Sequence, residues 1–311
     1  MTARQPHQSP FTGIFVPTVV PLHTDGRINE PELRRLVDYL IDRGVAGLYP
    51  NGSTGEFLRF TAEERIRIAT VVLDQAAGRV PVLAGVAEPT VAATVRECGR
   101  YADLGATAAA VVAPFYFRLR EESVEAWFDE IARQSPLDLL LYNIPAFASE
   151  ITVPVVQRLA TGRPRVIGLK DSSGDIAVMS RLAAAVDDVR PDFALLTGWD
   201  TTLVAMLLTG ADGGTNASAN VVPEVITALY EAAVAGDLST AWRLQRLVTP
   251  LFDRMLDAEF PVGFRVATAL RGIAIGPSRV SQTASQRSAA DTLAGDLRNL
   301  LQPMNELLCP L

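Results

Sequence analysis

Lys170 is the residue whose type most directly offers chemistry, because it is the single lysine in a chain that has 27 arginines. A guanidinium stays protonated at any working pH and is a poor nucleophile. A lysine amine can lose its proton when it is desolvated, and it can then form a Schiff base with a carbonyl compound. Lys170 stands near the end of the short apolar run RVIGLKD (165–171). This position favours a chemical function for Lys170 over chance survival of one lysine.

Other polar side chains follow similar apolar runs, each at the point where a strand is expected to end. They are Ser53, Thr54 and Glu56; Tyr116 and Arg118; Tyr142 and Asn143; Asp171 and Ser172; Asp200; and Thr215 and Asn216. In an α/β barrel, the carboxyl ends of the strands meet at one mouth, where active sites lie. Lys170 is therefore expected among hydroxyl groups at such a mouth.

Eight apolar runs are predicted as strands because they are apolar throughout, which is typical of parallel strands buried on both faces. The runs are 13–20, 46–52, 80–86, 108–114, 137–145, 165–171, 193–200 and 211–217. Amphipathic segments alternate with them, for example 30–44, 61–78, 90–105 and 121–134. The segment 61–78 opens with Thr61 and Glu64, the pattern of a capping box. Asp171 is a candidate cap for the helix after the sixth strand.

The alternation predicts the α/β class, with a (β/α)8 TIM barrel over residues 11–236 and a small C-terminal helical region over 237–311. Beyond residue 222 only helices are expected, over 223–236, 238–258, 261–274 and 284–302. A doubly wound open sheet is the alternative, although no G-x-G-x-x-G follows the first strand.

Composition limits the classes of function. The 311 residues are 49% hydrophobic and 20% charged, with a net charge of −7 and no basic cluster, which argues against a nucleic-acid partner. No secretory signal and no membrane span are expected. Cys98 and Cys309 lack metal-site spacing and are expected as reduced thiols in a cytoplasmic protein. With His7 and His23 as the two histidines, a histidine triad or a multi-histidine zinc site is not expected.

The stretch GSTGE (52–56) suggests an anion site at a strand end. Gly52 and Gly55 allow the backbone to turn so that N–H groups converge on an anion, and Ser53 and Thr54 add hydroxyl donors. A carboxylate next to a ketone fits such a site. A plain strand-to-helix turn is the other interpretation.

In combination, the motifs resemble the dihydrodipicolinate synthase / N-acetylneuraminate lyase family. They are GSTGE after the second strand, PFY after the fourth, YNIP at the fifth and GLKD at the sixth, followed by GADGG and SANVVPE. The resemblance runs from about residue 11 to about residue 300.

The resemblance implies a class I mechanism in which Lys170 forms the Schiff base with pyruvate or another 2-oxo acid. It implies that Tyr142 relays protons, and that Ser53 and Thr54 hold the pyruvate carboxylate and complete the relay. Tyr116 matches a relay tyrosine that a neighbouring subunit supplies in the synthase. The family usually forms homotetramers, as dimers of dimers, and the resemblance implies no metal and no organic cofactor.

Departures from the family pattern indicate the branch. The synthase has a carboxylate-binding arginine at the place of Phe147, whereas YNIPA with an apolar residue resembles the lyases. Asp200 matches an aspartate that contacts substrate hydroxyls in the sialic acid lyase, but the partner residues of that enzyme are only partly present. The motifs GSTGEF and PFYF favour the 2-keto-3-deoxy-gluconate type of aldolase. Arg118 is a candidate for a carboxylate contact from another position.

The favoured hypothesis is an aldolase that splits a 2-keto-3-deoxy sugar acid into pyruvate and an aldehyde. Its substrate-binding set comprises Gly52, Gly55, Phe147, Ser172, Asp200, Thr215 and Arg118. One alternative is a 4-hydroxy-tetrahydrodipicolinate synthase in which Arg118 replaces the missing arginine. A dehydratase or decarboxylase of the same family and a non-catalytic 2-oxo acid sensor are two further alternatives.

Overall fold

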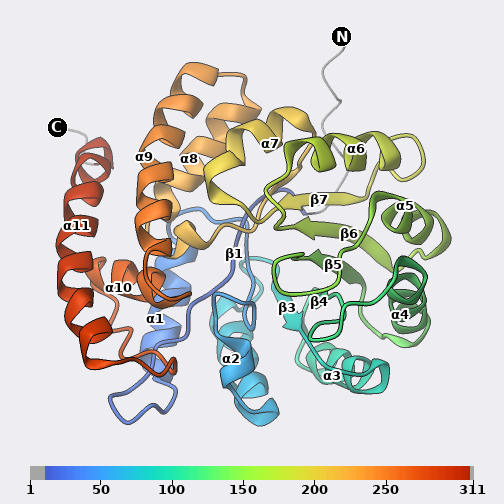
Figure 1. Cartoon of the computed structure of the whole chain (residues 1–311), viewed down its shortest axis with the longest axis horizontal. Coiled ribbons are helices and arrows are strands. Elements are labelled where there is room, and N and C mark those ends of the chain that lie inside the picture. The colour runs from blue at the N-terminus through green and yellow to red at the C-terminus, as the bar shows by residue number, and fades with distance from the viewer. Residues whose placement is uncertain (1–10, 309–311) are drawn as a thin grey trace. The chain divides into compact units, whose positions relative to one another are not determined.

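The structure is a computed structural model that describes residues 11–308, with side chains described to residue 304 (Figure 1). His7 and Cys309, for which the sequence made predictions, lie outside the described residues. Eight strands alternate with helices along the chain, and every strand lies within the run predicted for it. The strands are β1 (Gly13–Val16), β2 (Gly47–Leu48), β3 (Leu83–Val86), β4 (Ala108–Val112), β5 (Leu139–Asn143), β6 (Val166–Asp171), β7 (Ala194–Thr197) and β8 (Gly213–Gly214).

Each strand is shorter than its apolar run because the ends of the runs continue into the loops. All strand residues are buried except Ile167, which is half-buried. Strands that are buried along their whole length read as continuous apolar runs, which is why the sequence pattern located them. The succession of eight parallel βα units is the predicted (β/α)8 TIM-barrel class.

The helices also follow the predicted segments, with ends that differ by a few residues. They are α1 (Glu30–Ile41), α2 (Ala62–Ala76), α3 (Val91–Asp103), α4 (Glu121–Gln134), α5 (Val153–Gly162), α6 (Ile176–Val186), α7 (Leu203–Thr209), α8 (Pro223–Val234), α9 (Leu238–Leu256), α10 (Val262–Leu270) and α11 (Ala284–Leu308). Short 3-10 turns are η1 (Phe57–Arg59), η2 (Asp200–Thr202) and η3 (Ala217–Asn220). The predicted capping box of α2 is confirmed: the amide of Glu64 donates to the Thr61 hydroxyl (3.2 Å), and the amide of Thr61 donates to the Glu64 carboxylate (2.9 Å).

The described chain forms two compact units, and the first comprises residues 11–13 and 81–215. It contains β3 to β8, each paired in parallel with the next strand along the chain. Helices α3 to α7 cover these strands, and each of them packs against the next (Figure 1). Because the strands are parallel and in chain order, the residues at their carboxyl ends lie along one edge.

The second unit comprises residues 14–80 and 216–308. It contains the parallel pair of β1 and β2, where Phe15 aligns with Gly47 and Val16 with Leu48. Helices α1 and α2 pack together, α8 packs on α9, and α11 packs on both α9 and α10 (Figure 1). The helices predicted beyond residue 222 are therefore present. The predicted domain boundary between residues 236 and 237 stays a prediction. Helices α8 and α9, on either side of it, belong to the same unit as residues 14–80.

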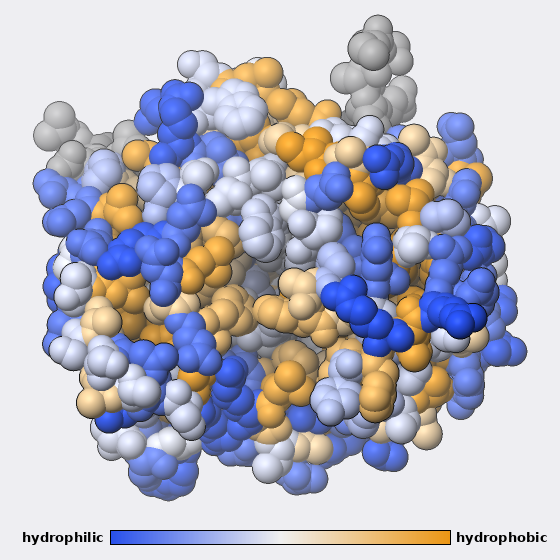
Figure 2. Space-filling view, in the orientation of Figure 1, coloured by the Kyte–Doolittle hydropathy of each residue, from blue (hydrophilic) through white to orange (hydrophobic). Residues whose placement is uncertain are grey.

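The surface mixes hydrophilic and hydrophobic side chains on the face drawn in Figure 2. Between residues 11 and 308, no helix combines the length and the apolar character that crossing a membrane requires.

Candidate active site

Lys170 lies on β6 and is buried, with 4% of its surface exposed. In the strand register, it stands between Tyr142 of β5 and Leu196 of β7. The Lys170 ammonium nitrogen lies 4.0 Å from the centroid of the Tyr142 ring, and Tyr142 is also buried. Lys170 is therefore a direct neighbour of Tyr142, the predicted proton-relay residue, near the ends of adjacent strands.

Burial is the main influence on the protonation of Lys170. It lowers the pKa of the ammonium below its ordinary value, because a charged group loses hydration in an apolar site. Tyr142 and the carboxylate of Asp200 oppose this effect and raise the pKa. A lysine whose pKa is lowered in this way supplies more of the neutral amine, which is the nucleophilic form.

One register step further, Asn143 and Asp171 join the ends of β5 and β6. The Asn143 amide donates to the Asp171 carboxylate (2.7 Å), and the Ser173 hydroxyl donates to the other oxygen of Asp171 (2.6 Å). The Asn143 side-chain oxygen accepts from the amide of Ile151 (3.0 Å). Both residues are buried, and burial raises the pKa of Asp171 while these two donors lower it. This link aligns the two strands that carry Tyr142 and Lys170.

The prediction that Asp171 caps the following helix is wrong. Asp175 is the cap of α6, and its carboxylate accepts from the amide of Val178 (3.0 Å). Asp171 is still within the strand, so its carboxylate faces Asn143 of the neighbouring strand instead of the helix.

The turn after β7 lies close to Lys170. A Cβ placed on Gly198 would stand 3.0 Å from the Lys170 Cε and would overlap the Ser172 hydroxyl. Gly198 therefore leaves the space that the lysine stem and Ser172 occupy. Asp200, predicted to contact substrate, is fully buried at the start of η2 and acts on Lys170 through its charge. Thr215 is buried after β8, where its amide donates to the Thr197 carbonyl (2.7 Å).

The loops after β4 and β5 carry three more of the predicted site residues. Tyr116 is 88% exposed with a φ of +75°, and its ring meets that of Phe117 edge to face. Phe147 is 63% exposed. The exposed Arg118 donates to the Pro145 carbonyl (3.2 Å), which ties its loop to the one that carries Phe147.

Ser149 strengthens the link between these two loops. It accepts from the amide of Leu119 (3.0 Å), and its own amide donates to the Pro114 carbonyl (2.8 Å). The two loops are thus joined by several hydrogen bonds, while their aromatic side chains stay exposed.

The GSTGE stretch belongs to the second unit and forms a tight turn. The amide of Gly55 donates to the Gly52 carbonyl (3.1 Å), and the amide of Glu56 donates to the Ser53 carbonyl (3.0 Å). These two amides serve the turn, so an anion would have to be bound by other donors of Ser53 and Thr54. Thr54 is buried, and Ser53 is half-buried.

The structure thus brings together Lys170, Tyr142, Ser172 and Asp200, and it places Tyr116, Arg118 and Phe147 on two linked loops. Sequence reasoning missed Gly198, although a glycine directly after an apolar run was a usable signal. Among the described residues, no three His, Cys, Asp or Glu side chains are grouped so that they could hold a metal ion.

Comparisons with known proteins identify a family and several relatives. Residues 10–299 match the model of the dihydrodipicolinate synthetase family. YjhH of Escherichia coli K12, provisionally named a 2-dehydro-3-deoxy-D-pentonate aldolase, is 32% identical over 78% of this chain and 80% of its own. YagE of the same organism, provisionally named a 2-dehydro-3-deoxy-D-gluconate aldolase, is 35% identical over 76% of this chain and 78% of its own.

A relative with a different name is similar to the same degree. The 4-hydroxy-tetrahydrodipicolinate synthase of an Exiguobacterium species is 32% identical over 87% of this chain and 91% of its own. The crystal structure of YagE in complex with pyruvate superposes with a TM-score of 0.87 at 30% identity, covering 94% of this chain and 99% of that one. The predicted fold class is confirmed by this match.

Proposed function

Because the chain belongs to the dihydrodipicolinate synthetase family, we propose that it is a class I aldolase that cleaves a 2-keto-3-deoxy sugar acid reversibly into pyruvate and an aldehyde. Lys170 carries the reaction through a Schiff base. The observation that supports this most strongly is the buried amine, with its lowered pKa, 4.0 Å from the Tyr142 ring.

The chemistry follows from the properties of an iminium ion. The neutral Lys170 amine adds to the 2-keto carbon, and water leaves as the C=N bond forms. As the C4 hydroxyl loses its proton to a base, the iminium accepts the electron pair of the C3–C4 bond, so that the aldehyde departs and an enamine of pyruvate remains. Protonation of the enamine at C3 and hydrolysis return the lysine. Tyr142, beside Lys170, is suited to carry the protons of these steps.

Carboxylate recognition is assigned to the GSTGE loop, with Ser53 and Thr54 as donors. This assignment rests on the family resemblance. It uses the donors of Ser53 and Thr54 because the amides of Gly55 and Glu56 already donate to carbonyls of the turn. The pyruvate bound to the related YagE shows that a member of this family takes up a 2-oxo acid.

The residues expected to contact the aldehyde distinguish the aldolase from the synthase. The synthase has an arginine for a second carboxylate where this chain has the exposed Phe147. Arg118 uses one of its donors for the Pro145 carbonyl, which places its guanidinium beside the loop of Phe147. The apolar residue favours an uncharged hydroxyaldehyde over an aldehyde that bears a carboxylate.

Tyr116 is proposed to act in the site of a neighbouring copy of the chain, in a dimer that pairs into a tetramer. Its 88% exposure and left-handed backbone support this, because a relay tyrosine that served its own chain would be expected to be buried. A cytoplasmic location is proposed from the same family membership.

The test is to incubate the protein with a panel of 2-keto-3-deoxy acids and to measure pyruvate and aldehyde release. The K170R variant serves as the control. Release of both products by the wild type alone supports the aldolase. Condensation of pyruvate with aspartate semialdehyde would support the synthase, and a 2-oxo product without aldehyde would support the dehydratase. Binding of pyruvate without turnover, retained in K170R, would support the sensor.

A further inference from the structure

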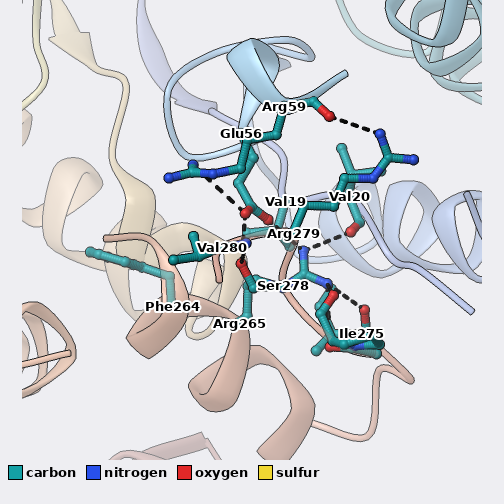
Figure 3. A network of polar contacts seen from close by, with 12 residues as sticks. Val19, Val20, Glu56, Arg59, Phe264, Arg265, Ile275, Ser278, Arg279 and Val280 are labelled. Carbon is teal, nitrogen blue, oxygen red and sulfur yellow. Dashed lines mark hydrogen bonds and ion pairs between the residues drawn. The ribbon is translucent and has the colours of Figure 1, made fainter. Parts of the chain in front are cut away.

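Arg265 of α10 is a buried arginine, 2% exposed, and both of its terminal nitrogens donate hydrogen bonds, while its buried Nε has no hydrogen-bond partner among the described residues (Figure 3). Its Nη1 donates to the Glu56 carboxylate (3.1 Å) and to the Val20 carbonyl (2.8 Å). Its Nη2 donates to three consecutive carbonyls: Ile275 (2.7 Å), Gly276 (3.3 Å) and Pro277 (2.7 Å). One guanidinium thus joins α10, the 275–277 segment and the last residue of GSTGE.

The Glu56 carboxylate is buried and makes contacts beyond the one with Arg265. The side chain is 1% exposed, and its second carboxylate oxygen accepts from the Ser278 hydroxyl (2.7 Å). Arg59 lies 3.8 Å from the same oxygen. The backbone of Glu56 has a φ of +59°, a left-handed conformation that is unfavourable for a residue with a side chain. Such a conformation persists when surrounding contacts over-determine it, and the contacts of Arg265 and Ser278 do so here.

The conformation of Glu56 is linked to that of the turn before it. The amide of Glu56 donates to the Ser53 carbonyl (3.0 Å), so the Ser53–Thr54 peptide moves with Glu56. The turn is also tightly enclosed, since a Cβ on Gly55 would lie 2.7 Å from the Thr18 carbonyl oxygen. A displaced Glu56 side chain would therefore shift the donors of Ser53 and Thr54.

We propose that Arg265 is a positioning residue for the GSTGE loop: by holding the Glu56 carboxylate, it sets the donors of Ser53 and Thr54 and hence the affinity for the carboxylate of the 2-oxo acid. The proposal rests on the proposed function, in which that loop binds the carboxylate. A guanidinium is required because its planar fork reaches the carboxylate with one nitrogen and the carbonyls with the other, which a lysine ammonium cannot do.

The experiment compares two ketones, pyruvate and acetone, which lacks a carboxylate. The full-length wild type and R265K are incubated with increasing ketone and then with borohydride, and the trapped adduct is quantified by mass spectrometry. For R265K, we expect the half-saturating concentration of pyruvate to rise by about 10-fold or more, the scale of a lost hydrogen bond to a charged group. The values for acetone and the amount trapped at saturating pyruvate are expected to stay unchanged. General damage to the site would instead raise the half-saturating concentrations of both ketones.

A matched control is R271K, because Arg271 at the end of α10 pairs with Glu224 and donates to the Tyr39 hydroxyl (3.1 Å). It is expected to leave the affinity for pyruvate unchanged. If R265K does not fold, S278A takes its place, because it removes the other donor to Glu56 while keeping the ion pair. It is expected to raise the half-saturating pyruvate by about 2- to 10-fold.

The outcomes separate the two proposals. The positioning proposal is overturned if R265K raises the half-saturating concentrations of pyruvate and acetone equally. It is also overturned if the folded variant leaves the value for pyruvate unchanged. Either result leaves the aldolase proposal standing. Absence of any pyruvate adduct on the wild type overturns the aldolase proposal and with it this one.

Discussion

Lys170 and Arg265 are both buried cations, 4% and 2% exposed, yet their surroundings differ. The Arg265 guanidinium meets a carboxylate at 3.1 Å and four backbone carbonyls. The Lys170 ammonium lies 4.0 Å from the centroid of the Tyr142 ring, and the negative charge of Asp200 raises its pKa. Burial lowers the pKa of both groups, but a guanidinium remains charged while an amine approaches neutrality. Arg265 therefore keeps its charge despite burial, whereas burial makes Lys170 a titratable amine, as the proposed Schiff-base chemistry requires.

The largest expected difference is in activity, on replacing each cation by methionine. K170M is expected to lose turnover by a factor on the order of 10⁴ or more, as enzymes do when a covalent nucleophile is removed. Its free energy of unfolding should stay equal or rise, because an apolar side chain avoids the desolvation of an amine. Steady-state kinetics and urea denaturation measure the two quantities. Activity within 10-fold of the wild type would show that Lys170 does not carry the chemistry.

R265M is expected to have a lower free energy of unfolding than the wild type, in contrast to K170M. Removing one partner of a buried ion pair typically costs about 3–5 kcal/mol, because the other charge stays buried without compensation. Glu56, with 1% of its side chain exposed, would be that charge. The double variant R265M/E56M should regain part of the loss. A change below about 1 kcal/mol in R265M would contradict a structural function for the pair.

The comparison also shows what the sequence could predict. The strands and the helices were predictable because buried parallel strands are continuous apolar runs. The place of Lys170 at the end of a buried strand was also predictable, and one lysine among 27 arginines drew attention to it. The family was recognisable from four ordered motifs and is confirmed. Asp171 was misjudged because its partner Asn143 depends on the pairing of β5 with β6, which no local pattern contains. Arg265 was overlooked, although an arginine within the apolar stretch VGFRVATAL was a visible signal of a buried ion pair.

A smaller effect is expected when space near Lys170 is filled. G198A would push against the Lys170 Cε and the Ser172 hydroxyl, and a displacement of about 1 Å at a reacting group can cost about 100-fold in rate. G99A is a suitable control, because nothing within 4 Å opposes an added Cβ in α3. It should keep activity and gain about 0.5–1 kcal/mol of stability. Equal activity in G198A and G99A would show that the space around Lys170 is not critical.

The smallest expected effect is a change in pH dependence. The Asp200 carboxylate favours the charged form of Lys170 and so raises its pKa. D200N removes this influence, and the pKa should therefore fall further. The pH midpoint for trapping a carbonyl compound on Lys170 should move to lower pH than in the wild type. A shift to higher pH would mean that the Asp200 charge does not act on the amine in this way.

The central claim is that Lys170 is the Schiff-base residue, and peptide mass spectrometry after borohydride reduction with pyruvate tests it most directly. The account predicts a single reduced pyruvate adduct on the peptide that contains Lys170, with none in K170R. No adduct with pyruvate or with any longer 2-oxo acid would contradict the account, and Lys170 would then be an accident of composition.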